Sequence, residues 1–157
     1  MTFWLLGSLA AVAPADLAPL FGPVALGTAT LFLLRWRMNV MSLPDEEARA
    51  LGVPTGLLRI VIVAAATLVT SASVATAGII GWVGLVVPHI ARTLVGPDFG
   101  RLIPASALIG GGFLLAIDTL ARTMAPIEIP LGILTAFVGT PFFIWLLASV
   151  SREWSAP

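Results

Sequence analysis

Long uncharged stretches alternate with short polar segments along this chain, and the stretches have the length of membrane-crossing helices. A helix needs about 20 apolar residues to span the hydrocarbon core of a bilayer. Leu17–Leu34 is an uncharged stretch of about this length, and Arg35 and Arg37 follow it. Two stretches of similar length lie nearer the C-terminus: Leu102–Ala121, whose one charged residue is Asp118, and the uncharged Leu131–Val150. The pattern therefore predicts three helices that each cross the membrane once.

The uncharged stretch Ile60–Ala91 is too long for a single crossing. At about 1.5 Å per residue it would make about 48 Å of helix, against a hydrocarbon core of about 30 Å. Gly78, Gly81 and Gly84 lie in this stretch, and glycine weakens a helix. We therefore expect a break at Gly78–Gly84 and two spans, of which the second is shorter. The expected spans are Ile60–Ala77 and Gly81–Leu94, and a membrane tolerates Pro88 within the second.

The most polar segment of the chain, Asn39–Arg59, lies between the first two spans. It is long for a connection between two helices. Pro44 followed by three acids is typical of a helix start, and Gly52 and Pro54 are expected to end that short helix. Two interpretations stay open, a solvated loop and a docking helix for a soluble partner. The acids are Asp45, Glu46 and Glu47.

The arginines give the predicted bundle an orientation. With five crossings, seven of the eight arginines fall on one side and only Arg122 falls on the other. The positive-inside rule makes the side with seven arginines cytoplasmic. The N-terminus is then outside, and no basic residue precedes Phe3–Leu6 as a signal peptide would require. We expect that earlier helices are missing. The seven are Arg35, Arg37, Arg49, Arg59, Arg92, Arg101 and Arg152.

Composition supports an all-α membrane protein that forms a single transmembrane domain over residues 1–157. Hydrophobic residues make up 59% of the chain and charged residues 10%, where a soluble domain has about 25% charged residues. The net charge is zero, which gives no basic surface for nucleic acid. Cysteine is absent and histidine occurs once, so the sequence offers no disulfide and no complete metal-ligand set. We expect no cofactor, no bound metal and no catalytic residue.

Four polar residues could still carry chemistry. His89 would need partners for a metal site or a proton relay, and a structural role at the membrane edge is favoured. Asp118 and Arg122 lie four residues apart, which is the spacing of an ion pair on one helix face. That pair could be purely local, or Arg122 could present a positive contact to an acidic partner. Glu128 could cap the last span, or less plausibly act in substrate passage.

Small residues punctuate the last span. Glycine and threonine at near-helical spacing thin one helix face, which serves either helix packing or a pore or dimer interface. Both interpretations stay open from spacing alone. The residues are Gly132, Thr135, Gly139, Thr140 and Pro141.

Several motifs, in order, closely resemble the FecCD-type permeases, the membrane subunits of ABC importers for iron–siderophores, haem and cobalamin. The most specific is the stretch from Gly78 to Arg92, GIIGWVGLVVPHIAR. The resemblance makes Gly81, Gly84, Pro88, His89 and Arg92 structural motif residues. It continues through Gly96–Asp98, Leu102–Ser106, Ala116–Arg122, Glu128–Thr135 and Gly139–Leu147, with further matches upstream at Trp4–Ser8 and from Met38 through Gly52.

The resemblance implies the second half of a ten-helix permease, about helices six to ten, in a bacterial inner membrane. Such a permease pairs with a second copy or a related permease, binds two ATPase subunits inside and a substrate-binding protein outside. It implies that Asn39–Arg59 couples to the ATPase, that Asp118, Arg122 and Glu128 dock the binding protein, and that Gly132, Thr135, Gly139 and Pro141 face the pathway or dimer seam. The implied coupling residues are Asp45, Glu46, Glu47, Arg49, Leu51 and Gly52.

The chain departs from the family pattern in two places. Leu43-Pro44-Asp45 stands where the family has leucine, glycine and an acid, and proline can still begin a helix. The first half of the permease is absent. The chain contains no lysine and no phosphate-binding loop, so any ATPase would be another chain.

Two other functions remain from the sequence. An intramembrane enzyme or proton-linked carrier would use His89, Asp118 and Glu128, although the predicted topology separates His89 from the two acids. The chain could also be a fragment that does not transport. The cargo is left open, since iron–siderophore, haem and cobalamin permeases share these motifs.

Overall fold

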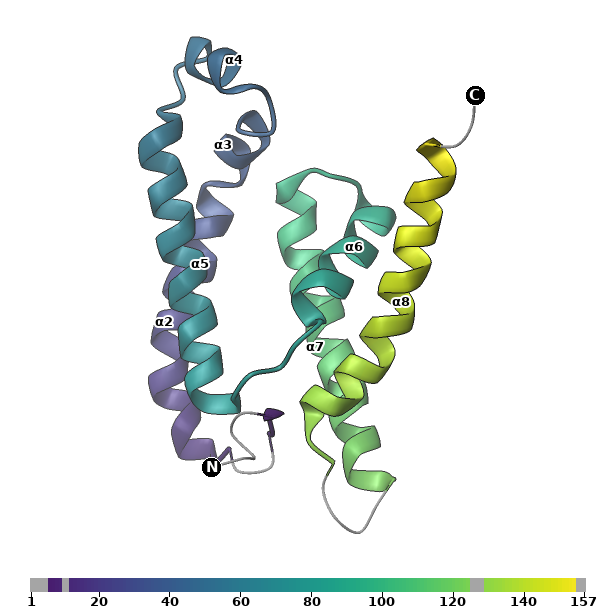
Figure 1. Ribbon diagram of the computed structural model, residues 1–157. Coiled ribbons are helices and arrows are strands. Elements are labelled where there is room, and N and C mark those ends of the chain that lie inside the picture. The colour runs from purple at the N-terminus through teal and green to yellow at the C-terminus, as the bar shows by residue number, and fades with distance from the viewer. Residues whose placement is uncertain (1–5, 10–11, 125–128, 155–157) are drawn as a thin grey trace.

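The computed structural model describes residues 6–9, 12–124 and 129–154, and seven helices account for most of them (Figure 1). The predicted all-α membrane fold is confirmed. The helices, labelled as in Figure 1, are α2 (Pro14–Leu33), α3 (Arg35–Val40), α4 (Asp45–Ala50), α5 (Thr55–Ala77), α6 (Val83–Val95), α7 (Phe99–Thr123) and α8 (Leu131–Trp154).

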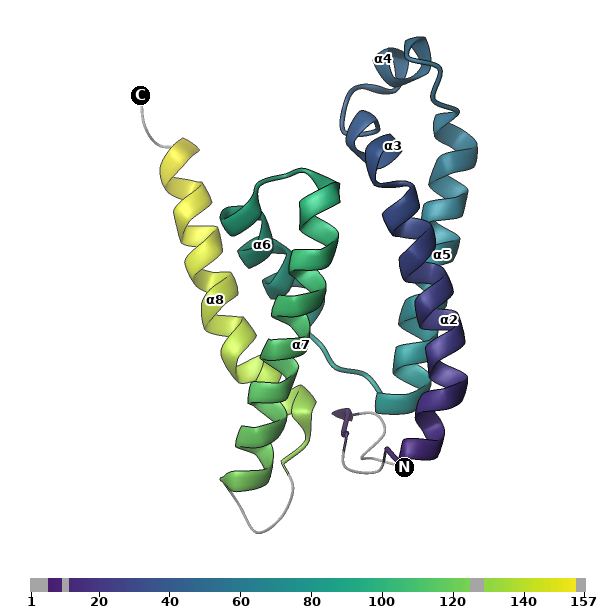
Figure 2. The same cartoon turned by 180° about the vertical axis from the view of Figure 1, so that it is seen from behind.

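Four of these helices, α2, α5, α7 and α8, are long and apolar enough to cross a membrane, and α6 is a shorter apolar helix. Each lies where the charge pattern predicted a span, within a few residues. When α6 is counted with the four long helices, each of the five runs in the opposite direction to the one before it in the chain (Figures 1 and 2). One end of the bundle, here named the arginine-rich end, holds α3, α4 and the α6–α7 turn. Arg122 lies near the opposite end of α7.

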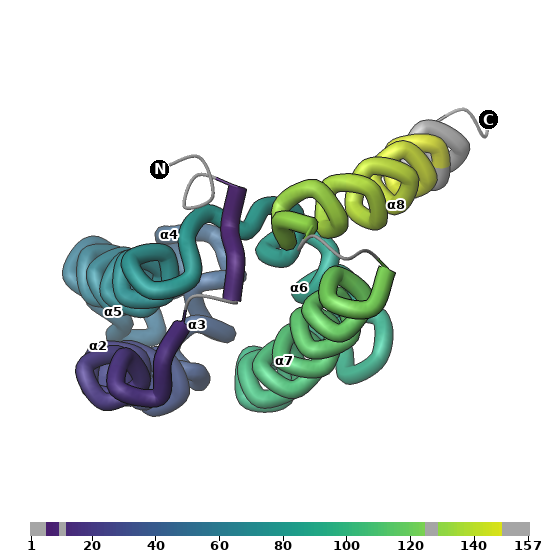
Figure 3. The backbone as a smooth tube through the Cα atoms, turned by 90° about the horizontal axis from the view of Figure 1, so that it is seen from below, coloured from purple at the N-terminus to yellow at the C-terminus, as the bar shows by residue number. Residues whose placement is uncertain are grey.

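The helices form two groups, α2 with α5 and α6 with α7 and α8 (Figure 3). Helix α2 starts with proline in its first turn, and the Asp16 carboxylate accepts a hydrogen bond from the Ala13 N–H at 2.9 Å. Gly27 brings α2 against α5, because a Cβ there would lie 2.9 Å from the Ala65 carbonyl oxygen. Small residues at such crossings let membrane helices approach closely.

The break predicted inside the long apolar stretch is confirmed. Helix α5 ends at Ala77, Gly78 adopts a φ of 75°, and α6 begins only at Val83. Helix α6 is about 20 Å long, which is less than a hydrocarbon core of about 30 Å. The extended segment Gly78–Trp82 adds about 16 Å at about 3.3 Å per residue. Helix and extended segment together therefore make one crossing.

The N-terminal segment Leu6–Leu9 lies against this break. The Ser8 N–H donates to the Ala77 carbonyl oxygen at 3.0 Å, and the Leu131 N–H donates to the Gly7 carbonyl oxygen at 3.0 Å. Gly7 has a φ of 71°, and a Cβ there would lie 2.7 Å from the Ile79 carbonyl oxygen. Three distant parts of the chain therefore meet at one junction that only glycine permits.

Few apolar side chains of the described residues are buried. Only 6% to 17% of the residues in the four long spans are buried. A small core, Ile117, Ala121 and Leu131, packs α7 against the start of α8. A soluble protein would not expose so much apolar surface, whereas lipid or further helices can cover it.

The opposite ends of the bundle should lie on opposite sides of the membrane. The chain has no cysteine, so a single introduced thiol reports its own position. We expect Ser42→Cys to react with a membrane-impermeant maleimide only in inverted vesicles, and Thr123→Cys only in right-side-out vesicles. The unsubstituted chain is the blank. Labelling of both thiols from the same side would contradict the five-crossing arrangement.

Candidate functional site

Helix α4 at the arginine-rich end is anchored to the start of α5. Arg59 Nη2 lies 3.3 Å from Asp45 Oδ1, and Arg49 Nε donates to Thr55 Oγ1 at 3.2 Å. Beneath these contacts Ala48, Val53 and Leu58 are buried, at 0%, 4% and 3% exposure. Asp45 and Arg49, two of the predicted coupling residues, therefore hold α4 in place.

The other predicted coupling residues leave an exposed surface on α4. Glu46 and Glu47 are exposed, Leu51 is 61% exposed, and Gly52 adopts a φ of 79° where the chain turns back toward α5. Pro44 caps α4, which confirms that a helix can begin directly after this proline. We name Glu46, Glu47 and Leu51 the α4 surface; it offers two carboxylates and an apolar side chain to a partner.

Sequence reasoning missed a polar contact between α3 and α7. Asn39 Nδ2 donates to Asp98 Oδ1 at 2.5 Å, and the Phe99 N–H donates to Asn39 Oδ1 at 2.9 Å. Asp98 also caps α7 by accepting from the Gly100 N–H at 3.0 Å. Asn39 and Asp98 lie 59 residues apart in the sequence, so spacing gives no signal of their contact.

These hydrogen bonds lower the pKa of Asp98 below its ordinary value of 3.8. The largest cause is the bond from Asn39, followed by the Gly100 N–H, while Arg101 and Arg35 add a smaller attraction. Because the pKa is lowered on folding, the stabilisation is present above the unfolded value and is lost as pH falls through the folded value. Asp98 is therefore a charged acceptor at neutral pH.

Asp118 and Arg122 form the predicted ion pair near the opposite end of α7. Arg122 Nε lies 2.8 Å from Asp118 Oδ2, and Arg122 Nη2 lies 3.2 Å from Asp118 Oδ1. The Arg122 side chain is 48% exposed and that of Asp118 is 19% exposed. The carboxylate therefore orients the guanidinium of a half-exposed side chain. Glu128, the third predicted docking residue, lies outside the described residues.

Three of the small residues of α8 face the interior of this chain. A Cβ on Gly132 would lie 2.5 Å from the Leu6 carbonyl oxygen, and one on Gly139 would lie 2.6 Å from the Trp82 Cβ. Thr135 is fully buried, and its Oγ1 donates to the Gly132 carbonyl oxygen at 3.2 Å. These contacts correspond to the helix-packing interpretation that the spacing left open.

Pro141 lies on an exposed face of α8 instead. A shallow groove on that face is lined by Ile133, Ala136, Phe137, Thr140 and Pro141. Phe137 is 78% exposed. This α8 groove is an apolar surface that nothing in the described residues covers.

The motif around the break fixes α6 in place. Trp82 adopts a left-handed φ of 68°, unusual for a residue with a side chain, and its ring lies 6.1 Å from the Phe143 ring. Pro88 lies inside α6, and Arg92 is exposed near its end. Neither Gly81 nor Gly84 has a neighbouring atom that would exclude a Cβ.

His89 packs against an aromatic side chain of α8. Its ring lies 5.7 Å from the Phe142 ring, edge to face. His89 is six residues from the arginine-rich end of α6, whereas Asp118 is five residues from the other end of α7. Along antiparallel helices that separates them by roughly 20 Å. The described residues contain no group of three metal-ligating side chains.

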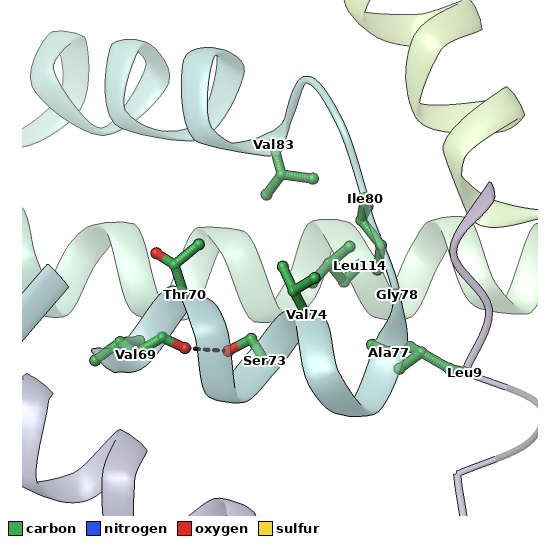
Figure 4. Close-up of a pocket in the computed structure, with 10 residues that line it drawn as sticks. All are labelled: Leu9, Val69, Thr70, Ser73, Val74, Ala77, Gly78, Ile80, Val83 and Leu114. Atoms are coloured by element: carbon green, nitrogen blue, oxygen red, sulfur yellow. Dashed lines mark hydrogen bonds between the residues drawn. The ribbon is translucent and has the colours of Figure 1, made fainter. Parts of the chain in front are cut away.

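An apolar pocket of about 290 Å³ opens between α5, the extended segment and α7 (Figure 4). Thr70 and Ser73 are its polar side chains, and Ser73 Oγ is already bonded to the Val69 carbonyl oxygen at 2.8 Å. The pocket walls come from both helix groups. Its remaining lining is Leu9, Val69, Val74, Ala77, Gly78, Ile80, Val83 and Leu114.

The bundle of apolar helices that alternate in direction is that of a membrane protein, and comparison with known proteins gives its family. Residues 1–149 match the FecCD transport family, and the chain belongs to this family. A Helicobacter pylori protein assigned to iron chelatin transport as a permease is 42% identical over 144 residues, covering 92% of this chain and 44% of that protein. The molybdate import permease MolB of Haemophilus influenzae is 40% identical over 97% of this chain and 45% of its own length.

A solved structure shares the fold as well as the sequence. It is a metal-chelate type ABC transporter in an inward-facing conformation, with a TM-score of 0.89 and 40% identity over 94% of this chain and 49% of that one. The chain thus spans about half the length of the proteins it matches.

The packing of Trp82 against Gly139 of α8 can be tested by substituting alanine at two glycines, one in the contact and one outside it. In Gly139→Ala the new Cβ meets the Trp82 side chain, and such overpacking costs about 1–3 kcal/mol. In Gly112→Ala on α7 no atom lies within 4 Å of the new Cβ, and alanine favours a helix by up to about 1 kcal/mol. Thermal unfolding in detergent, followed by tryptophan fluorescence, should show a lower midpoint only for Gly139→Ala. Equal midpoints would contradict the contact.

Proposed function

We propose that this chain is part of the membrane permease of an ATP-driven importer for a metal compound, working in a bacterial inner membrane. The observation that carries the proposal is the match to the FecCD transport family over residues 1–149. The exposed apolar helices support a membrane location. The permease would form a path, with no bond chemistry of its own.

The chain would work together with the rest of a longer permease. It spans 44% and 45% of two relatives that are permeases, and roughly half of the similar solved chain. The apolar pocket between α5 and α7 suits an apolar helix, because its polar groups are few and Ser73 is already bonded. We infer that a helix from the remaining half of the permease fills it.

The α4 surface would bind an ATPase subunit. It projects from the arginine-rich end, which the positive-inside rule makes cytoplasmic. Asp45 and Arg49 anchor α4 to α5, so a push on Glu46, Glu47 and Leu51 would move both helices. ATPase closure would thereby tilt the helices and open the path to alternate sides. The segment 39–59 is then the coupling loop of a single transmembrane domain.

Arg122 would contact an acidic group of an external substrate-binding protein. Its side chain is paired with Asp118 and is about half exposed. On α8, Gly132, Thr135 and Gly139 already pack against other parts of this chain. The exposed α8 groove with Pro141 would therefore be the surface that faces a second permease copy or the path.

The cargo would be a metal compound such as an iron chelate, haem or cobalamin. Relatives of similar identity are named for iron chelatin and for molybdate. The enzyme alternative has less support, because His89 and Asp118 lie at different depths and His89 packs on Phe142.

Charge reversal can test separately whether the α4 surface binds an ATPase and whether Arg122 binds a substrate-binding protein. An affinity-tagged chain purified from native membranes should carry ATPase activity that vanadate inhibits. Charge reversal of both Glu46 and Glu47 to lysine should reduce the bound ATPase about tenfold or more, because like charges now oppose the partner. Arg122→Glu should retain the ATPase and instead weaken the salt-sensitive binding of the substrate-binding protein.

Each variant serves as the control for the other. An unsubstituted chain without ATPase would refute the proposed function. Full ATPase retention by Glu46→Lys/Glu47→Lys would refute only the α4 surface. Unchanged binding-protein affinity at low salt in Arg122→Glu would refute only the docking role.

A further inference from the structure

The contact between Asn39 and Asp98 joins the two helix groups at the arginine-rich end. Asn39 lies on α3, which continues from α2, and Asp98 caps α7. The Asn39 side chain bonds both the Asp98 carboxylate and the Phe99 N–H. A Cβ on Gly100 would lie 3.4 Å from Arg35 Cδ, so the same two helices also approach beside the contact.

The chemistry of this contact selects asparagine. A backbone N–H only donates and an ionised carboxylate only accepts, so position 39 must offer one acceptor and one donor. Aspartate there would place two carboxylates together, and leucine would offer neither group. Asp98 in turn serves both Asn39 and the capping bond from Gly100.

The position of the contact allows it to transmit movement between α4 and α7. Four residues, 41–44, separate α3 from α4, so a displacement of α4 reaches α3 over a short distance. The contact then fastens α3 to the first turn of α7. We propose that Asn39 and Asp98 are a positioning pair that carries movement of α4 into α7. This inference rests on the proposed ATPase coupling of the segment 39–59.

The test compares variants that distinguish the capping of α7 by Asp98 from the bond between Asp98 and Asn39. Asn39→Leu removes both bonds. Asp98→Ser keeps a good helix cap but is too short to reach Asn39. Asp98→Asn keeps both the cap and an acceptor for the Asn39 amide, so it is the conservative variant that should retain function.

The measurement is the distance between spin labels on Ser42→Cys, beside α4, and Leu108→Cys, an exposed position on α7. The labels are placed in the purified transporter complex, without nucleotide and after vanadate trapping. We expect one unchanged narrow distance in both states for the parent and for Asp98→Asn, because α4 and α7 move together. We expect Asn39→Leu to lose this common movement and show a vanadate-dependent shift, with the ATPase still bound. Asp98→Ser removes only the bond to the carboxylate and keeps the bond from the Phe99 N–H, so it should show a smaller shift.

Three outcomes would overturn the proposal. Parent-like distances in Asn39→Leu and Asp98→Ser would show that movement is carried elsewhere. Loss of the ATPase from both variants would show that the pair only shapes the α4 surface. A parent complex without ATPase would refute the proposed function and this inference with it, and that result is distinct from the other two.

Discussion

The backbone of a membrane-crossing chain must find its hydrogen-bond partners within the protein, and this constraint organises the whole molecule at Gly78–Trp82. Hydrocarbon offers no water to bond an exposed N–H or carbonyl group. An extended segment at that depth survives only where protein surrounds it. Here Leu6–Leu9 and the start of α8 lie against it, since a Cβ on Gly7 or Gly132 would lie within 4 Å of the Ile79 carbonyl oxygen. The Ser8 N–H also bonds the carbonyl of Ala77, just before the segment, and the Leu131 N–H bonds the carbonyl of Gly7. The N-terminus, the middle and the last helix are thereby bound into one junction.

The ion pairs found among the described residues lie near the two ends of the bundle, where each has a separate effect. At the arginine-rich end, Asp45 and Arg49 secure α4 while Glu46 and Glu47 stay exposed. At the other end Asp118 orients Arg122. Apolar faces between them are left for lipid or for other helices. This division between fixed and presented charges is what a permease that binds partners on both sides of a membrane would need.

The sequence predicted the spans well because charges mark where helices leave the membrane, and it predicted the break because 32 uncharged residues exceed one crossing. It could not predict which way a side chain points once helices pack. Gly132, Thr135 and Gly139 share a spacing that suits a pore or a packing face, and spacing gives no sign that Leu6 lies against Gly132 and Trp82 against Gly139. The contact of Asn39 with Asp98 depends on two groups meeting across the fold, and no local pattern encodes that.

The shortness of α6 has a consequence for how length can vary along this chain. If Gly78–Trp82 became helical, α5 and α6 would merge into one rod of about 60 Å, and the number of crossings would drop from odd to even. Everything after it would be inverted, and Arg122 would change sides. A change of length in a turn outside the membrane has no such effect, because residues added there leave the parity of the crossings untouched. Insertions and deletions among relatives should therefore avoid the five residues of the break.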